Sequence, residues 1–174
     1  MGHALSVNFE VQGVSLIVQD KDMACWYASA QMVLDWKRRR QIGALATLPV
    51  QVDQETADLY KANDGLQNFQ ILPLAKRLGL VTVPPMSPTI DGLLRWLKQY
   101  GPLWTNGKRH IVVIAGLRGS AAKGVEVNVY DPWPGVGVGW RSLSGWYAGF
   151  DPCAFNASSR DAGREVEAVF LHAP

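Results

Sequence analysis

Apolar residues in the first part of the chain recur with the period of a helix. The longest run, WYASAQMVLDWKRRR at residues 26–40, contains neither proline nor glycine. One face of it carries Trp26, Ala30, Val33 and Trp36. The opposite face is also largely apolar until Lys37, so the pattern predicts a helix that is buried on most sides. The basic end of this helix, residues 37–40, complements the negative pole of the helix dipole.

Two shorter helices are predicted after this run. Residues 54–63 follow Asp53, which is a good N-cap, and the helix should stop before Gly65. Residues 69–78 form the next helix, which Gly79 would end because glycine adopts the left-handed conformation of a C-cap.

A fourth helix and then a series of strands complete the pattern. The helix is predicted to open with Ser87 as N-cap and Pro88 in its first turn, and to end at Gly101. The period then changes to two, which predicts strands at 103–106, 110–117, 125–131, 139–143 and 166–172. The segment SGWYAGF, residues 144–150, suggests a helical turn. Helices first and strands second predict an α+β fold with an antiparallel sheet.

Composition narrows the class of protein without naming its chemistry. The chain has 174 residues, so we expect residues 1–174 to form a single domain. A net charge of +2 is too small to indicate binding of nucleic acid or an anionic membrane. The sequence contains no apolar stretch of 18 residues, which a membrane span would need. Its N-terminal residues lack the pattern of a signal peptide. Two cysteines do not form a disulfide framework.

Cys25 stands directly before the long helix, and three interpretations of it are open. It is a small core hydrophobe, half of a disulfide, or a nucleophile at a helix N-terminus. Cysteine attacks carbonyl groups as its thiolate, which the positive end of a helix dipole and a nearby imidazolium both favour. The position of Cys25 gives it the positive end of a helix dipole. The imidazolium would have to come from a histidine elsewhere in the chain. The other cysteine, Cys153, follows Asp-Pro in a predicted loop and is interpreted as a bystander.

His110 and Asp131 are candidates for the imidazole and for the group that orients it. His110 opens an apolar strand just after a turn, and Asp131 ends the next strand. A hairpin brings these outer ends together, and a turn centred near 120–121 would place residue 131 nearly opposite residue 110. Taken alone, each has a simpler interpretation: a histidine at a sheet edge, and an aspartate that starts an Asp-Pro turn.

Gln19 completes a set of four residues in the chain order Gln, Cys, His, Asp. Its amide could donate to the oxyanion of a tetrahedral intermediate together with the backbone N–H of Cys25, although alone it would be a loop glutamine. The set resembles the papain-like cysteine peptidases: Q-x5-C-W ends at Trp26, a histidine opens a strand, and D-P-W ends at Trp133.

The resemblance runs from about residue 15 to residue 147. The stretch "GPLW…H-IVV-I-AG" makes the sequence similar to the bacterial minimal branch of the family. That branch includes bacteriocin-leader peptidases and injected or contact-delivered effector proteases. The resemblance implies a papain-like α+β fold: N-terminal helices, a long buried central helix with the cysteine at its N-terminus, and a C-terminal antiparallel sheet. Where plant-type enzymes have a glycine-rich approach to the cysteine, this chain has DKDMA, so substrate preference stays open.

The resemblance also implies a role for each site residue. Cys25 would be the nucleophile, His110 the base, Asp131 the orienting group and Gln19 the oxyanion donor. Trp133 would shield the contact between the histidine and the aspartate. Trp104 and Asn106 are further candidates for the wall of the substrate cleft.

The expected function is therefore a cysteine endopeptidase, either a bacterial effector or toxin or a stand-alone protease, without metal or other cofactor. Two alternatives stay open: an amidase that cleaves peptidoglycan peptides, and a catalytically silent peptidase fold that serves as a binding module. The expected partners are a protein or peptide substrate and an inhibitor or immunity protein, with no nucleic acid. We expect synthesis in the cytoplasm and delivery to another cell by a route that needs no signal peptide.

Overall fold

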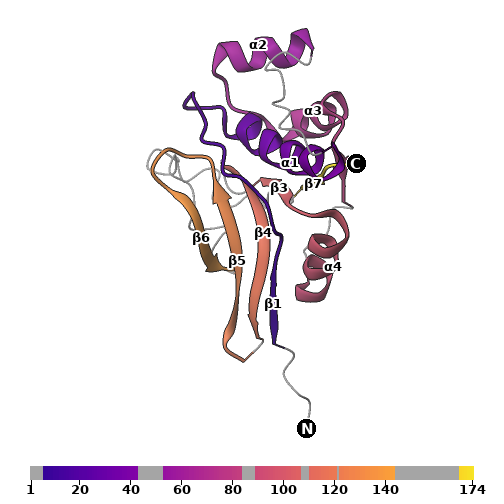
Figure 1. Ribbon diagram of the computed structural model, residues 1–174. Helices are drawn as coiled ribbons and strands as arrows, with labels where there is room; N and C mark the ends of the chain where they lie inside the picture. Colours follow the sequence, from indigo (N-terminus) through magenta and orange to yellow (C-terminus); the bar gives the residue numbers. More distant parts are fainter. Residues whose placement is uncertain (1–5, 43–52, 84–88, 107–109, 121, 144–168) are drawn as a thin grey trace.

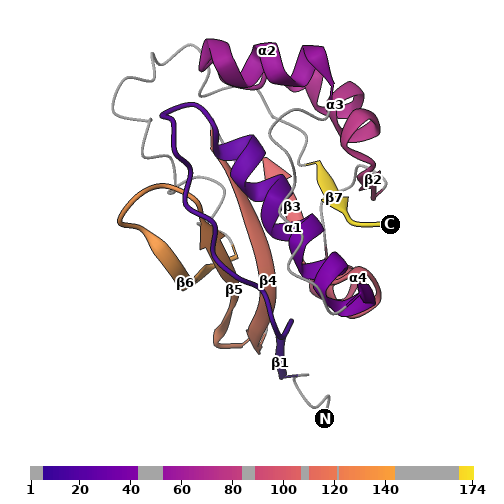
Figure 2. The same cartoon turned by 45° about the horizontal axis from the view of Figure 1, so that its top comes forward.

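The computed structural model describes residues 6–42, 53–83, 89–106, 110–120, 122–143 and 169–174. In these residues helices gather on one side of an antiparallel sheet (Figure 1). Figure 2 shows the long helix α1 running close to strands β3 and β4, with α2 and α3 lying beyond it. The predicted α+β class is confirmed.

Helix α1 spans Cys25–Ile42, one residue earlier and two residues later than the sequence predicts. Its residues are buried on most sides, as expected from the apolar pattern on both faces. Two hydrogen bonds tie it to the sheet: Trp104 Nε1 donates to the carbonyl oxygen of Trp26 (3.0 Å), and Ser29 Oγ donates to that of Ile111 (3.3 Å). The N-terminal turn of α1 is therefore fixed against β3 and β4.

The basic end of α1 makes local contacts. Arg39 forms an ion pair with Asp35 one turn earlier, with 2.9 Å between Nε and Oδ2. The guanidinium of Arg40 lies over the ring of Trp36, 4.9 Å from its centroid. These contacts agree with the interpretation of residues 37–40 as a helix terminus.

The next two helices begin and end close to the predicted residues. Helix α2 (Gln54–Ala62) is capped by Asp53, whose Oδ1 accepts from the backbone N–H of Thr56 at 2.8 Å. Its C-cap, Asn63, is left-handed with φ of 54°. A short 3₁₀ turn, η1 (Asn68–Gln70), leads into helix α3 (Ile71–Leu78), which Gly79 ends as predicted.

Helix α4 (Ile90–Tyr100) has a different N-cap from the predicted one. Its N-cap is Thr89, whose Oγ1 accepts from the N–H of Gly92 at 3.0 Å, so the prediction of Ser87 was two residues early. The helix ends at Gly101, as predicted. A side chain there is excluded twice, since φ is 84° and a Cβ would lie 2.3 Å from the Trp36 ring.

The sheet has the strand order β2-β7-β3-β4-β5-β6, with β1 also paired to β4. The strands are β1 (Val7–Glu10), β2 (Val81–Thr82), β3 (Leu103–Asn106), β4 (Ile111–Ser120), β5 (Gly124–Asp131), β6 (Gly137–Ser142) and β7 (Phe170–His172). The strands β1 and β2 are not among those that the sequence pattern predicts. Residues 144–150 and the first part of the predicted strand 166–172 lie outside the described residues.

Strands β1 and β3 share one edge of β4. β3 pairs with residues 111–114 and β1 with residues 116–119, so the two follow each other along the same strand. This covers most of the length of β4, whose residues are nearly all buried. The start of β4, directly after His110, is thereby held between β3 and β5.

Candidate active site

Cys25 is the first residue of α1. The carbonyl oxygen of Ala24 accepts from the N–H groups of Tyr27 and Ala28, both at 3.1 Å, so Ala24 is the N-cap. The side chain of Cys25 is partly exposed at the positive end of an 18-residue helix. This is the placement in which the helix dipole favours a thiolate.

His110 immediately precedes β4 and lies between Cys25 and Asp131. Its Nε2 contacts Asp131 Oδ1 at 2.7 Å, and its side chain also makes a hydrogen bond to Cys25. Because the aspartate takes Nε2, the ring presents Nδ1 to the thiol. His110 is 3% exposed and Asp131 is fully buried, so water competes little for the contact. The structure thus brings three predicted site residues together.

The hairpin register differs from the predicted one. Ser120 pairs with Gly124, so the turn centres on residue 122, later than the predicted 120–121. Val113 pairs with Tyr130, and the register shifts between Ile114 and Gly116. Asp131 is therefore a diagonal neighbour of His110 on the same face of the sheet, which is within reach for side chains of this length.

Asp131 determines the charge state of the histidine. Burial alone would lower the pKa of His110, but hydrogen bonds to Asp131 and Cys25 and the charges of both groups raise it to about 9. Burial would raise the pKa of Asp131, but the hydrogen bond and the charge of His110 hold it below its ordinary value. The imidazolium and the carboxylate therefore coexist at neutral pH.

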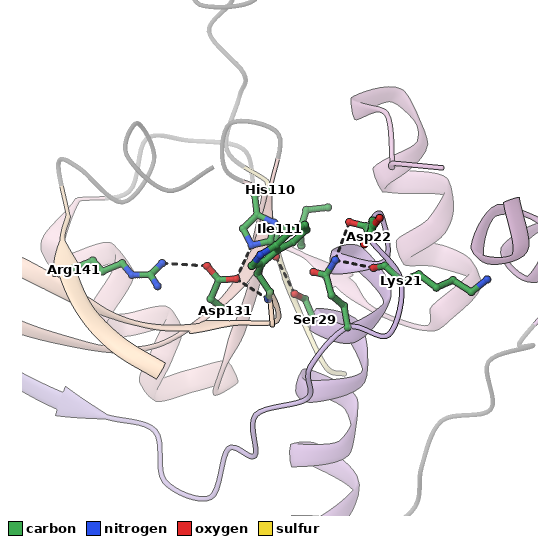
Figure 3. Close-up of polar contacts among 9 residues, drawn as sticks. Lys21, Asp22, Ser29, His110, Ile111, Asp131 and Arg141 are labelled. Carbon is green, nitrogen blue, oxygen red and sulfur yellow. Dashed lines mark hydrogen bonds and ion pairs between the residues drawn. The ribbon is translucent and has the colours of Figure 1, made fainter. Parts of the chain in front are cut away.

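Arg141 on β6 is a further site residue that the sequence motifs do not predict. Its Nη1 lies 3.4 Å from Asp131 Oδ2, and Figure 3 shows the guanidinium and the imidazole on opposite sides of the carboxylate. The backbone N–H of Trp133 also donates to Asp131 Oδ1 at 2.9 Å. Each carboxylate oxygen is thus held in place. The only sequence signal for this contact was an arginine within the predicted strand GWRSL. The sequence could not predict that its side chain reaches Asp131.

Trp133 lies beside the histidine, as the resemblance implied. Its ring meets the ring of His110 edge-on, with the centroids 6.5 Å apart and the planes at 81°. The indole is half-buried, so it covers one side of the imidazole without enclosing the site. This position suits a shield between the ion pair and water.

Gln19 lies next to the same motif, but its amide is engaged. Its backbone N–H donates to the carbonyl oxygen of Pro132 at 2.9 Å. Its Nε2 donates to the carbonyl oxygens of Lys21 (2.8 Å) and Asp22 (2.9 Å), contacts visible in Figure 3. Both N–H bonds of the amide are occupied, so an oxyanion would have to displace one of these carbonyl groups. A charged oxygen is the stronger acceptor, which favours that exchange.

Trp104 and Asn106, the two further candidates for a cleft wall, are both buried. Trp104 is 1% exposed and holds the first turn of α1, while Asn106 is 3% exposed and accepts from the N–H of Val169 at 2.7 Å. These contacts fix both side chains within the fold, and their assignment to the substrate cleft stays a prediction. Cys153 lies outside the described residues.

Among the described residues, no group of three or more histidine, cysteine, aspartate or glutamate side chains could hold a metal ion. The same part of the chain contains no helix that is both long and apolar enough to cross a membrane.

The geometry is that of a papain-like cysteine protease: a cysteine at the N-terminus of a buried helix, and a histidine at the start of a facing strand. A family model described as "papain-like cysteine protease AvrRpt2" matches residues 2–148, and the chain belongs to this family. No curated protein matches the chain.

Among solved structures, the chain is similar to UfSP from C. elegans, with a TM-score of 0.60 and 13% sequence identity. The match covers 99% of this chain and 35% of that one, so the chain spans about a third of the length of this neighbour. The likeness supports the fold.

Replacement of Gln19 by alanine tests its role in the site. We expect kcat to fall by about 10²–10³ with little change in KM, because an oxyanion donor acts mainly in the transition state. Steady-state kinetics on a peptide substrate would measure both constants. A loss confined to KM would instead place Gln19 in contact with the ground-state substrate.

Proposed function

We propose that the protein is a cysteine endopeptidase that uses Cys25, His110 and Asp131 as a catalytic triad. The single observation that carries the proposal is the position of His110, which contacts the thiol on one side and a buried carboxylate on the other. The raised pKa of His110 keeps the imidazole protonated at neutral pH, and an imidazolium beside a cysteine is the arrangement that activates such a nucleophile. The papain-like family of the chain supports the same reaction class.

The proposed reaction has two halves. The thiolate of Cys25 attacks the carbonyl carbon of a peptide bond, and the oxyanion that forms is stabilised by the backbone N–H of Cys25 and by Gln19. The imidazolium of His110 then protonates the leaving amine, and a thioester remains on the sulfur. His110 next takes a proton from water, which attacks the thioester and releases the carboxylic acid and the thiol.

Asp131 holds the imidazole in place during both halves of the reaction. Its Oδ1 contacts Nε2 of His110, so the ring keeps Nδ1 directed at the sulfur while the proton moves. Because the carboxylate is fully buried, its charge acts on the imidazolium with little screening by water. The intact pair argues against a silent binding module, since such a module needs no oriented imidazole.

A bacterial effector or toxin role is the biological setting that we propose with it. It rests on the resemblance of the sequence to contact-delivered proteases. Synthesis in the cytoplasm and delivery to another cell without a signal peptide belong to the same proposal, as does an inhibitor or immunity protein that would protect the producing cell.

The proposed activity is tested by cleavage of a proteome. The purified full chain is incubated with a bacterial lysate and separately with a eukaryotic lysate, and new protein N-termini are mapped by mass spectrometry. We expect new N-termini that share a sequence motif and that are absent when the thiol is first blocked with iodoacetamide. N-termini equally abundant with and without the blocking reagent would contradict the proposal.

A further inference from the structure

Residues 19–24, here called the nucleophile loop, lead directly into Cys25. Its inner side is fixed by the amide of Gln19, which binds two carbonyl groups of the loop itself. Its last backbone N–H before Cys25, that of Ala24, donates to the carbonyl oxygen of Lys21 at 3.2 Å. The path of this loop therefore decides where the N-cap and the thiol are placed.

The outer side of the loop is fastened to the C-terminal end of α2, forty residues further along the chain. The backbone N–H of Met23 donates to Oδ1 of Asn63 at 3.0 Å. The hydroxyl of Tyr60 donates to Asp20, and Lys21 Nζ lies 4.8 Å from the centre of the Tyr60 ring. Burial and the Asp20 carboxylate raise the pKa of Tyr60 to about 12, so its hydroxyl stays a donor.

Asn63 combines two functions that few residues can supply together. Its backbone is left-handed, with φ of 54° and ψ of 39°, and its N–H caps α2 by donating to the carbonyl oxygen of Tyr60 at 3.1 Å. It is the only non-glycine residue with positive φ in the described part of the chain. Glycine would serve the cap equally well, but it has no oxygen to offer the N–H of Met23.

Gly65 brings the same segment against the side chain of Met23. A Cβ at Gly65 would lie 2.7 Å from Cε of Met23, a distance that normal packing does not allow. Met23 is therefore held through its backbone by Asn63 and lies close to the backbone at Gly65. This second contact shows that the segment after α2 stays close to the nucleophile loop beyond Asn63.

We propose that Asn63 is a positioning residue for the nucleophile: by fixing Met23 two residues before Cys25, it sets the placement of the thiol against His110. The inference rests on the proposed role of Cys25. A misplacement of about 1 Å at a reacting group can lower a rate by about 100-fold, so one fixed backbone atom this close to the thiol matters. Asn63 touches neither thiol nor substrate in this role.

The test compares Asn63→Gly with Asn63→Asp in the full chain. Glycine keeps the left-handed cap and removes the acceptor, whereas aspartate tolerates the same backbone and keeps an oxygen for Met23. We expect Asn63→Gly to lower kcat by about 10- to 100-fold with an unchanged melting temperature. The melting temperature should hold because water can satisfy the exposed Met23 N–H and glycine relaxes the cap. Asn63→Asp should restore most of kcat.

A second readout needs no substrate. The rate at which iodoacetamide alkylates Cys25, followed by mass spectrometry across pH, reports the pairing of the thiol with His110. We expect Asn63→Gly to change the pH profile of alkylation and Asn63→Asp to retain that of the parent protein. The proposal is overturned if Asn63→Gly keeps a kcat within twofold of that of the parent protein. It is also overturned if the loss of kcat comes with a lower melting temperature and Asn63→Asp does not restore it. An inactive parent protein would instead overturn the proposed function.

Discussion

Cys25→Ala is expected to abolish peptide hydrolysis while the fold stays intact. Alanine has no nucleophile, and the loss of one sulfur atom from a partly exposed side chain costs little packing. We expect kcat to fall by about 10⁴-fold or more, because the members of a triad act as a unit. Cleavage of a substrate from the N-terminus map would measure the loss, and circular dichroism would confirm the fold.

Two further variants complete this experiment. His110→Ala should lose nearly as much activity as Cys25→Ala, since a thiol without its imidazole neither ionises readily nor protonates the leaving amine. Cys153→Ala is the matched control, and it should keep the parent activity if Cys153 is a bystander. Full activity in Cys25→Ala would remove Cys25 from the mechanism.

The central helix and the approximate site were predictable because local sequence determines them. Residues 26–40 contain no helix breaker and are apolar on both faces, so a buried helix beginning near Cys25 follows from the pattern alone. The alternating strands around His110 and Asp131 likewise predict a hairpin whose outer ends meet. The contact between these two residues was therefore foreseen, although its register was not.

The register was wrong for a physical reason. A hairpin is set by its turn and by any extra residue in a strand, and here the pairing of Ser120 with Gly124 moves the centre of the turn to residue 122. The shift near Ala115 then moves the far end of the hairpin by one residue. Neither feature has a clear signal in a single sequence.

Contacts between distant segments were outside the reach of sequence patterns. Arg141 pairs with Val127, so its long side chain must reach along the sheet to meet Asp131. A strand pattern assigns a side chain to one face of the sheet but does not give its reach along the strand. Asn63 contacts Met23 because the C-terminal end of α2 packs against the nucleophile loop that precedes α1. β1 pairs with β4 across more than a hundred residues, and its four residues carry too short an alternation to stand out.

Asp131→Asn is expected to keep measurable activity and to move the alkaline limb of the pH–rate profile to lower pH. The carbonyl oxygen of asparagine can still accept from His110 Nε2, so the ring stays oriented. The negative charge that helps to raise the histidine pKa to about 9 is lost. In the parent protein the imidazolium is present below about pH 9 and is lost as the pH rises through that value. In the variant the loss should begin at lower pH.

The comparison with Asp131→Ala separates orientation from charge. Alanine removes the acceptor that forms a buried ion pair with His110 and also binds the backbone N–H of Trp133, and it leaves the half-buried guanidinium of Arg141 without this carboxylate. Breaking a buried ion pair costs about 3–5 kcal/mol, so Asp131→Ala should be both less stable and far less active than Asp131→Asn. Asparagine also turns an amide N–H₂ toward Arg141, which should lower its melting temperature to an intermediate value. Kinetics from pH 5 to pH 10 and thermal unfolding of all three proteins would measure this order. Equal activity of Asp131→Ala and the parent protein would mean that His110 needs no carboxylate to orient it. An unchanged alkaline limb in Asp131→Asn would mean that the charge of Asp131 does not determine the protonation of the histidine.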